Sequence, residues 1–157
     1  MSAASAINPT SIPGLEFKEI VVAVSLKDGC ENTALYAVQL AHFFNSRLHV
    51  LYVHDPEPIS EIVGSEAMTI LEQEQRLAEQ NLELLVADLQ QIHPDCNGEF
   101  LMGEPIEEIA RYADAHNADL IVTASHHPGF LVRLFGLDYA PRIMHEASCP
   151  VLVVAGK

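Results

Sequence analysis

Histidine is the residue type whose spacing in this chain first suggests site chemistry. His126 and His127 are adjacent, and His54 and His145 also lie close to the ends of apolar or helical segments. Imidazole binds Zn, Cu and Ni, but neighbours on an extended segment point apart and seldom bind the same ion. Cysteine and carboxylate ligands do not occur at a matching spacing. We therefore predict no metal site and expect loop histidines, with a pH-sensing role left open because imidazole titrates near neutrality.

Nucleophilic residues do not fall into a catalytic pattern. Ser125-His126 and Cys149 lack a matching base and a group to orient it, so we predict no catalytic residue and no enzyme. Cys149 precedes Pro150 in an apolar run, which indicates a buried structural thiol. Cys30, Cys96 and Cys149 are far apart with no CxxC pair. This spacing predicts neither a disulfide framework nor a zinc site and fits a reducing cytoplasm.

An apolar loop follows the two adjacent histidines. Its sequence, PGFLVRLFGL from Pro128 to Leu137, contains six apolar residues. If the segment Phe130 to Leu137 is exposed, it forms a patch large enough to dock a protein partner. If its side chains instead tuck under a neighbouring element, it covers a crevice. Both interpretations remain open from the sequence.

Short apolar runs alternate with helical patterns along the chain. We expect strands at Lys18 to Ser25, Arg47 to His54, Asn97 to Met102, Asp119 to Ser125 and Cys149 to Ala155, and helices at Cys30 to Asn45, Ser65 to His93, from Pro105 onward and at Tyr139 to Glu146. Alternating strands and helices predict a parallel sheet with helices on both faces, because parallel strands need crossover connections. We therefore predict an α/β domain over residues 16–157 that follows a flexible tail, residues 1–15.

Apolar spacing also predicts which faces of the helices are buried. In the first helix the predicted stripe is Leu35, Val38, Ala41 and His42, and in the long helix it is Leu71, Ala78, Leu82, Leu85, Leu89 and Ile92. Steps of three, four and seven keep these residues on one face. The third strand contains Gly98, which favours an edge position.

The sheet type indicates where a ligand would bind. In doubly wound sheets, ligands occupy the crevice beyond the carboxyl ends of the strands, where the strand order reverses. If the first and fourth strands are adjacent, that crevice lies between Ser25 to Asp28 and Ala124 to Asp138. Val53 and His54, at the end of the second strand, border it.

Five segments carry a family resemblance that spans Phe17 to Ala155. They are VVAV in the first strand, LHVLYV in the second, GEPIEEI at the third helix, ADLIV in the fourth strand and CPVLVV in the last. In this order they resemble the universal stress protein family. The resemblance implies a Rossmann-like sheet with strand order 3-2-1-4-5. It also implies a homodimer in which the last strands, Cys149 to Ala155, pair.

The nucleotide loop of that family is altered in this chain. Members that bind ATP carry Gly-x-x-Gly, nine further residues, then Gly and Ser or Thr, and the matching positions here are Ala124, His127, Leu137 and Asp138. A β-carbon at His127 obstructs the close backbone approach that glycine allows. Asp138 places a carboxylate beside the phosphates.

Two further positions bear on this site. Ser25 stands where ATP-binding members carry an acidic residue, and Gly136 is one position short of the motif. The pattern resembles the A-type bacterial members, which lack the glycine motif and do not bind ATP as the others do. We predict a non-enzymatic stress-response regulator or adaptor with a degenerate nucleotide site and no cofactor. The alternative is a sensing module that holds ATP or AMP in a shifted geometry around Gly129 and Gly136.

Composition excludes two classes of partner. The 157 residues include 8 basic and 22 acidic side chains, which gives a net charge of −14. Nucleic-acid binding relies on clustered Lys and Arg, and anionic membrane surfaces attract the same residues, so we expect neither partner. Met1 to Gly14 has no basic start and no apolar stretch, so we expect no signal peptide.

Overall fold

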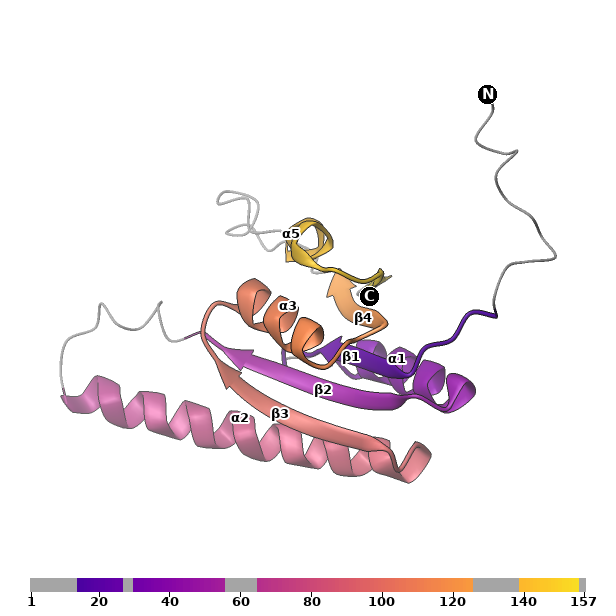
Figure 1. Ribbon diagram of the computed structural model, residues 1–157. Helices are drawn as coiled ribbons and strands as arrows, with labels where there is room; N and C mark the ends of the chain where they lie inside the picture. Colours follow the sequence, from indigo (N-terminus) through magenta and orange to yellow (C-terminus); the bar gives the residue numbers. More distant parts are fainter. Residues whose placement is uncertain (1–13, 27–29, 56–64, 126–138, 156–157) are drawn as a thin grey trace.

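The computed structural model describes residues 14–26, 30–55, 65–125 and 139–155. The elements are β1 (Glu19–Ala23), α1 (Cys30–Phe44), β2 (Arg47–His54), α2 (Ser65–Ile92), β3 (Cys96–Met102), α3 (Pro105–Ala115), β4 (Leu120–Ser125), α5 (Tyr139–Glu146) and β5 (Val151–Ala155). The strands form one parallel sheet in the order β3-β2-β1-β4-β5 (Figure 1). The predicted α/β fold and strand order are confirmed. The predicted tail lies almost wholly outside the described residues, so the domain limits remain a prediction.

The sheet lies between two helical layers (Figure 1). Alternate side chains of the central strands pack on opposite faces, as the period of two requires. Ile20, Val22, Leu48, Val50 and Val122 face α1 and α2, whereas Val21, Leu51 and Ile121 pack with Ile106, Ile109 and Ile143 of α3 and α5. Burial on both faces explains why the central strands read as continuous apolar runs.

Three strands are shorter than predicted, and one of them is β4, which begins at Leu120 rather than Asp119. β1 spans Glu19–Ala23 rather than Lys18 to Ser25, and β5 begins at Val151 rather than Cys149. Ala23 is the last residue of β1 in register with a residue of β2, although the Val24 amide still donates to the Leu51 carbonyl at 2.9 Å. Pro150 cannot donate a backbone hydrogen bond, although its carbonyl accepts one from the Ile121 amide at 3.0 Å.

The helices differ from the predicted stripes at three positions. In α1, Leu35 is 44% exposed and His42 is also exposed, whereas the smaller Ala34 and Ala37 are buried with Val38 and Ala41. In α2, Ile92 is 43% exposed and Val86 is buried instead. A Cβ on Gly98 of β3 would lie 2.7 Å from Val86 Cγ2, so the glycine makes room for the valine. Sequence periodicity could not reveal this fit, because it depends on the strand beneath the helix.

Candidate functional site

The strand order reverses between β1 and β4, which are neighbours at the centre of the sheet. Ile20 pairs with Leu120 and Val22 with Val122. The chain continues from β1 to β2 on one side and from β4 to β5 on the other. The carboxyl ends of β1 and β4 therefore border the crevice where doubly wound domains bind ligands.

Three predicted site residues are among the described residues at the carboxyl ends of these strands. Ser25 is half-buried and follows β1, Val53 lies near the end of β2 and Ala124 near the end of β4. Val53 packs against the apolar cluster under α3. Side chains alternate between the two faces of β4. The side chains of Ile121 and Thr123 point to one face, and that of Ala124 points to the other face, toward the α1 layer. The structure thus brings the three positions to one edge of the sheet, but on different faces.

The chain turns sharply after Ser25. Leu26 has a φ of 54°, in the left-handed region that a bulky residue rarely occupies. Such conformations cost energy and cluster at ligand sites. The backbone therefore changes direction at Leu26, directly beyond the end of β1 at the switch point.

The other predicted positions are His127, Gly129, Gly136, Leu137 and Asp138, and they lie outside the described residues. The same holds for His126 and for the apolar loop Phe130 to Leu137. Their roles in the crevice remain predictions from the sequence.

The amino end of α3 adds acidic groups at the same edge of the sheet. Glu104 is the N-cap, and its side chain accepts a hydrogen bond from the Glu107 amide at 2.8 Å. Arg142 of α5 lies 3.5 Å from the Glu104 carboxylate. A helix N-terminus usually attracts anions, but here a carboxylate of the chain already occupies it. Ser, Thr, Asp and Asn are the usual N-caps, so the sequence alone did not indicate this contact.

A second polar cluster, which the sequence patterns did not indicate, lies at the opposite end of the sheet, where the strands begin. His49 of β2 is 4% exposed. Its Nε2 lies 2.7 Å from the Glu19 carboxylate of β1, and its Nδ1 lies 3.0 Å from the Tyr112 hydroxyl of α3. The Tyr112 ring stacks on His116 with a centroid distance of 3.9 Å. The available signal was a polar side chain at a buried position within the apolar strand RLHVLYVH.

The groups of this cluster satisfy one another. A carboxylate can only accept, so Nε2 of His49 carries a proton and donates to Glu19. In the neutral imidazole, Nδ1 then accepts from the Tyr112 hydroxyl. Burial raises the pKa of Tyr112, nearby Glu99 adds to the rise, and a hydrogen bond with Asn97 opposes it. Tyr112 therefore stays a phenol at neutral pH, and the cluster ties α3 to the sheet.

Cys96 and Cys149 are poor nucleophiles at neutral pH. Burial, followed by the charge of Asp95, raises the pKa of Cys96 to about 11. Burial also raises the pKa of Cys149, and Asp114 and Asp119 add to the rise. A thiol attacks as its thiolate, and a raised pKa keeps both groups protonated. Cys149 is half-buried, not fully buried.

Within the described residues, no three His, Cys, Asp or Glu side chains form a group that could hold a metal ion. None of the described helices combines the length and apolar character needed to cross a membrane.

The element order and the switch point define a doubly wound parallel α/β domain. The family model described as "Universal stress protein family" matches residues 16–155. A universal stress protein of Methanocaldococcus jannaschii is 31% identical over 150 residues, which cover 88% of this chain and 82% of that protein. The chain belongs to the universal stress protein family.

Solved structures agree with this assignment at the level of the fold. The universal stress protein UspA from Lactobacillus plantarum superimposes with a TM-score of 0.74 at 22% identity, covering 90% of this chain and 99% of that one. A universal stress protein solved in complex with cAMP superimposes with a TM-score of 0.70 at 17% identity, covering 90% of this chain and 98% of the other.

Proposed function

We propose that this protein is a non-enzymatic stress-response regulator or adaptor whose nucleotide crevice is degenerate. The observation that carries the proposal is Ser25, which follows β1 at the switch point. The family resemblance places an acidic nucleotide contact at this position in ATP-binding members. The loop substitutions Ala124, His127, Leu137 and Asp138 support the same conclusion, since they replace glycines and a hydroxyl residue.

A second candidate function is an adenine-nucleotide-sensing module. It is favoured by the solved family member that contains cAMP, which has the same fold as this chain. Gly129 and Gly136 would then supply the close backbone approach in a shifted register. In this alternative ATP or AMP is the ligand, and the protein senses the nucleotide without turning it over.

The first experiment measures bound nucleotide directly. Freshly purified protein is denatured, and the supernatant is separated by anion exchange with mass detection. We expect no adenine nucleotide, and no heat when the protein is titrated with Mg-ATP, AMP or cAMP. A nucleotide close to one per subunit would contradict the degenerate site and establish the sensing module.

A restored loop provides the matched control for that titration. The variant Ala124→Gly, His127→Gly, Leu137→Gly, Asp138→Ser carries the family motif in this scaffold, and Ser25→Asp restores the acidic contact. We expect the combined variant to release heat with Mg-ATP where the unmodified protein does not. If neither protein binds, the loop residues are not what prevents binding, and the degenerate-site explanation fails.

We also propose a homodimer that pairs along β5 and a protein partner at the loop Phe130 to Leu137. β5 is an edge strand, and Leu152 is 38% exposed; an uncovered apolar edge favours pairing with another chain. The Pro150 carbonyl points toward β4. The backbone groups of successive residues point alternately to the two sides of a strand, so the Val153 amide points away from β4, to the open side of β5. Val153→Pro should give a monomer in sedimentation, whereas Val153→Ala should stay dimeric. Equal masses for the two variants would contradict pairing through this strand.

The loop proposal has its own test. Phe130→Ser with Phe135→Ser should weaken capture of protein partners from a lysate of the source cells without unfolding the chain. An unchanged capture profile would count against a docking role. A reducing cytoplasm is the compartment we propose, because the cysteine spacing predicts no disulfide framework.

A further inference from the structure

β3 leaves one row of its backbone groups without a strand partner. It lies at the edge of the sheet opposite β5, next to β2. The Leu48 amide donates to the Asp95 carbonyl at 2.9 Å, and the Gly103 amide donates to the His54 carbonyl at 3.0 Å. Backbone groups of a strand alternate between its two edges, so odd-numbered residues face β2. The outward groups belong to Cys96, Gly98, Phe100 and Met102.

A side chain of α2 covers only the start of this row. Gln90 Nε2 donates to the Cys96 carbonyl at 2.7 Å, where a neighbouring strand would otherwise bind. Within the part of the chain that the structure describes, Gly98, Phe100 and Met102 have no such partner for their outward groups. Met102 is 51% exposed. With respect to the described residues, the edge is therefore open from Gly98 to Met102.

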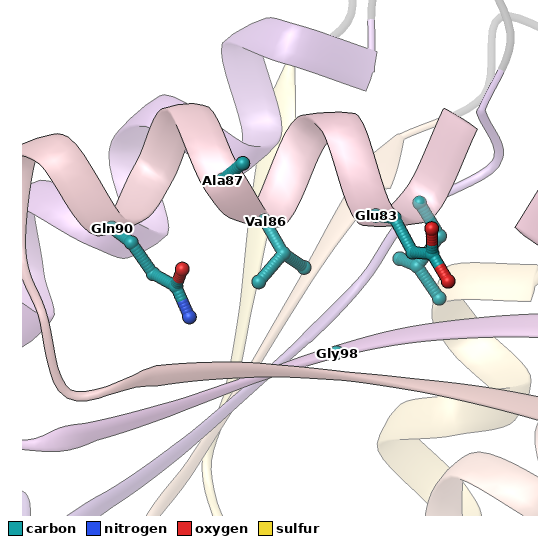
Figure 2. Close-up of a pocket in the computed structure, with 6 residues that line it drawn as sticks. Glu83, Val86, Ala87, Gln90 and Gly98 are labelled. Atoms are coloured by element: carbon teal, nitrogen blue, oxygen red, sulfur yellow. The ribbon is translucent and has the colours of Figure 1, made fainter. Parts of the chain in front are cut away.

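A groove of about 190 Å³ lies between this edge and α2 (Figure 2). It is lined by Leu82, Glu83, Val86, Ala87, Gln90 and Gly98. Figure 2 shows Glu83, Val86 and Gln90 on the strand-facing side of α2, above Gly98. The volume is several times the roughly 30 Å³ that one water occupies, so the groove can take an aliphatic side chain. Its interior is apolar, and Glu83 and Gln90 supply the polar rim.

The charges around the groove select the kind of segment that fits. Glu83 lies on its rim and Glu99 is exposed on the other face of the strand, whereas the Asp95 carboxylate before β3 is already paired with Arg47 at 3.3 Å. A second copy of this chain would add a second set of these carboxylates to the interface, and the lining of the groove contains no Lys or Arg to offset them. Lys or Arg on an incoming segment would instead complement Glu83.

We propose that the open edge of β3 and the adjoining groove form a docking site for an extended basic segment of another protein. The segment adds a strand beside β3, as in strand-addition complexes. It places one aliphatic side chain in the groove and a Lys or Arg beside Glu83. This site lies at the opposite edge of the sheet from β5, so it is independent of the proposed dimer and of the nucleotide crevice.

The test uses the full chain and a defined probe. The probe is a capped, fluorescein-labelled hexapeptide in which a lysine and a leucine stand two positions apart, so that both side chains face α2, and binding is measured by fluorescence anisotropy. One control peptide carries N-methyl groups on the backbone nitrogens of one edge, and another replaces lysine with glutamate. The protein variants are Glu83→Lys, Ala87→Leu and Met102→Pro, with Met102→Ala as the matched control. Circular dichroism verifies that each variant is folded.

We expect the lysine peptide to bind. The affinity of the N-methylated peptide should be lower by a factor of about ten or more, because strand addition relies on main-chain hydrogen bonds. Glu83→Lys, Ala87→Leu and Met102→Pro should each weaken binding by a similar factor, while Met102→Ala should bind like the unmodified protein. The glutamate peptide should not bind.

Several results would overturn the proposal. They are no binding of the lysine peptide, equal binding of the N-methylated peptide, or equal losses for Met102→Ala and Met102→Pro. Equal binding of the N-methylated peptide would mean general attraction to a chain of net charge −14. A dimer that Met102→Pro dissociates would mean that a second copy occupies the edge. If Met102→Pro does not fold, the N-methylated peptide on the unmodified protein decides the question.

Discussion

Tyr112→Phe is the smallest change that tests the polar cluster of Glu19, His49 and Tyr112. It removes one hydroxyl, which lies 3.0 Å from His49 Nδ1, and keeps the ring that stacks on His116. The His49 side chain is only 5% exposed. Water therefore cannot readily replace the lost hydroxyl, and Nδ1 stays buried without a donor.

The expected cost follows from these contacts. An intramolecular hydrogen bond contributes about 1 kcal/mol net, and a buried acceptor left unpaired costs about 1–3 kcal/mol. The bond between His49 Nε2 and Glu19 at 2.7 Å remains, and Arg47 stays 3.7 Å from the Glu19 carboxylate. We therefore expect the free energy of unfolding to fall by about 1–3 kcal/mol.

Urea unfolding followed by circular dichroism measures this change. Tyr36→Phe is the matched control, because Tyr36 is 51% exposed on α1, and a surface change of this kind is usually within about 0.5 kcal/mol. The dependence on urea should be the same for both variants, since the surface exposed on unfolding hardly changes. If Tyr112→Phe costs no more than Tyr36→Phe, the imidazole has another donor and the reasoning about the buried cluster is wrong.

Three further predictions concern stability and use the same unfolding assay. Asp119→Ala should cost about 1–3 kcal/mol, because its Oδ2 accepts from two backbone amides at the start of β1, at 2.7 and 2.9 Å; a smaller loss than that of an exposed Asp→Ala change would contradict this. Burial and Asp95 raise the pKa of Cys96 from 9.0 to about 11, so the folded protein keeps a proton that the unfolded chain loses, and stability should fall as pH rises through this window. Cys96→Ala should remove that part of the slope, and an unchanged slope would refute the assignment. Gly98→Val should destabilise the chain because its Cβ would lie 2.7 Å from Val86 Cγ2, and Val86→Ala in the same chain should recover part of the loss; two additive losses would show that the contact is not the cause.

Sequence patterns were most informative for elements whose structure depends on residues that are close together in the chain. β2 was predicted at its observed limits, Arg47–His54, because a continuous run of apolar and β-branched residues bounded by turns favours a buried strand. The edge position of β3 was also predicted, from Gly98 in a weak strand. The strand order relied on the family resemblance as well, since alternating strands and helices allow more than one order.

The common location of three candidate residues at the carboxyl ends of the strands was predictable, whereas their role in a crevice stays a prediction. Ser25, Val53 and Ala124 do lie at one edge of the sheet, because parallel strands place their carboxyl ends together. The different face of Ala124 was not predicted, because the direction of a side chain depends on the phase of its strand. The nucleotide-loop residues stay predictions.

The sequence by itself determined the fold class, the order of elements and the end of the sheet at which the candidate residues gather. Tertiary structure alone decided the His49 cluster, whose partners are 30 and 63 positions away in the chain. It also decided the groove beside β3, where Gly98 meets Val86. The physical reason is that both depend on strand register and helix approach, which bring together residues that no local periodicity links.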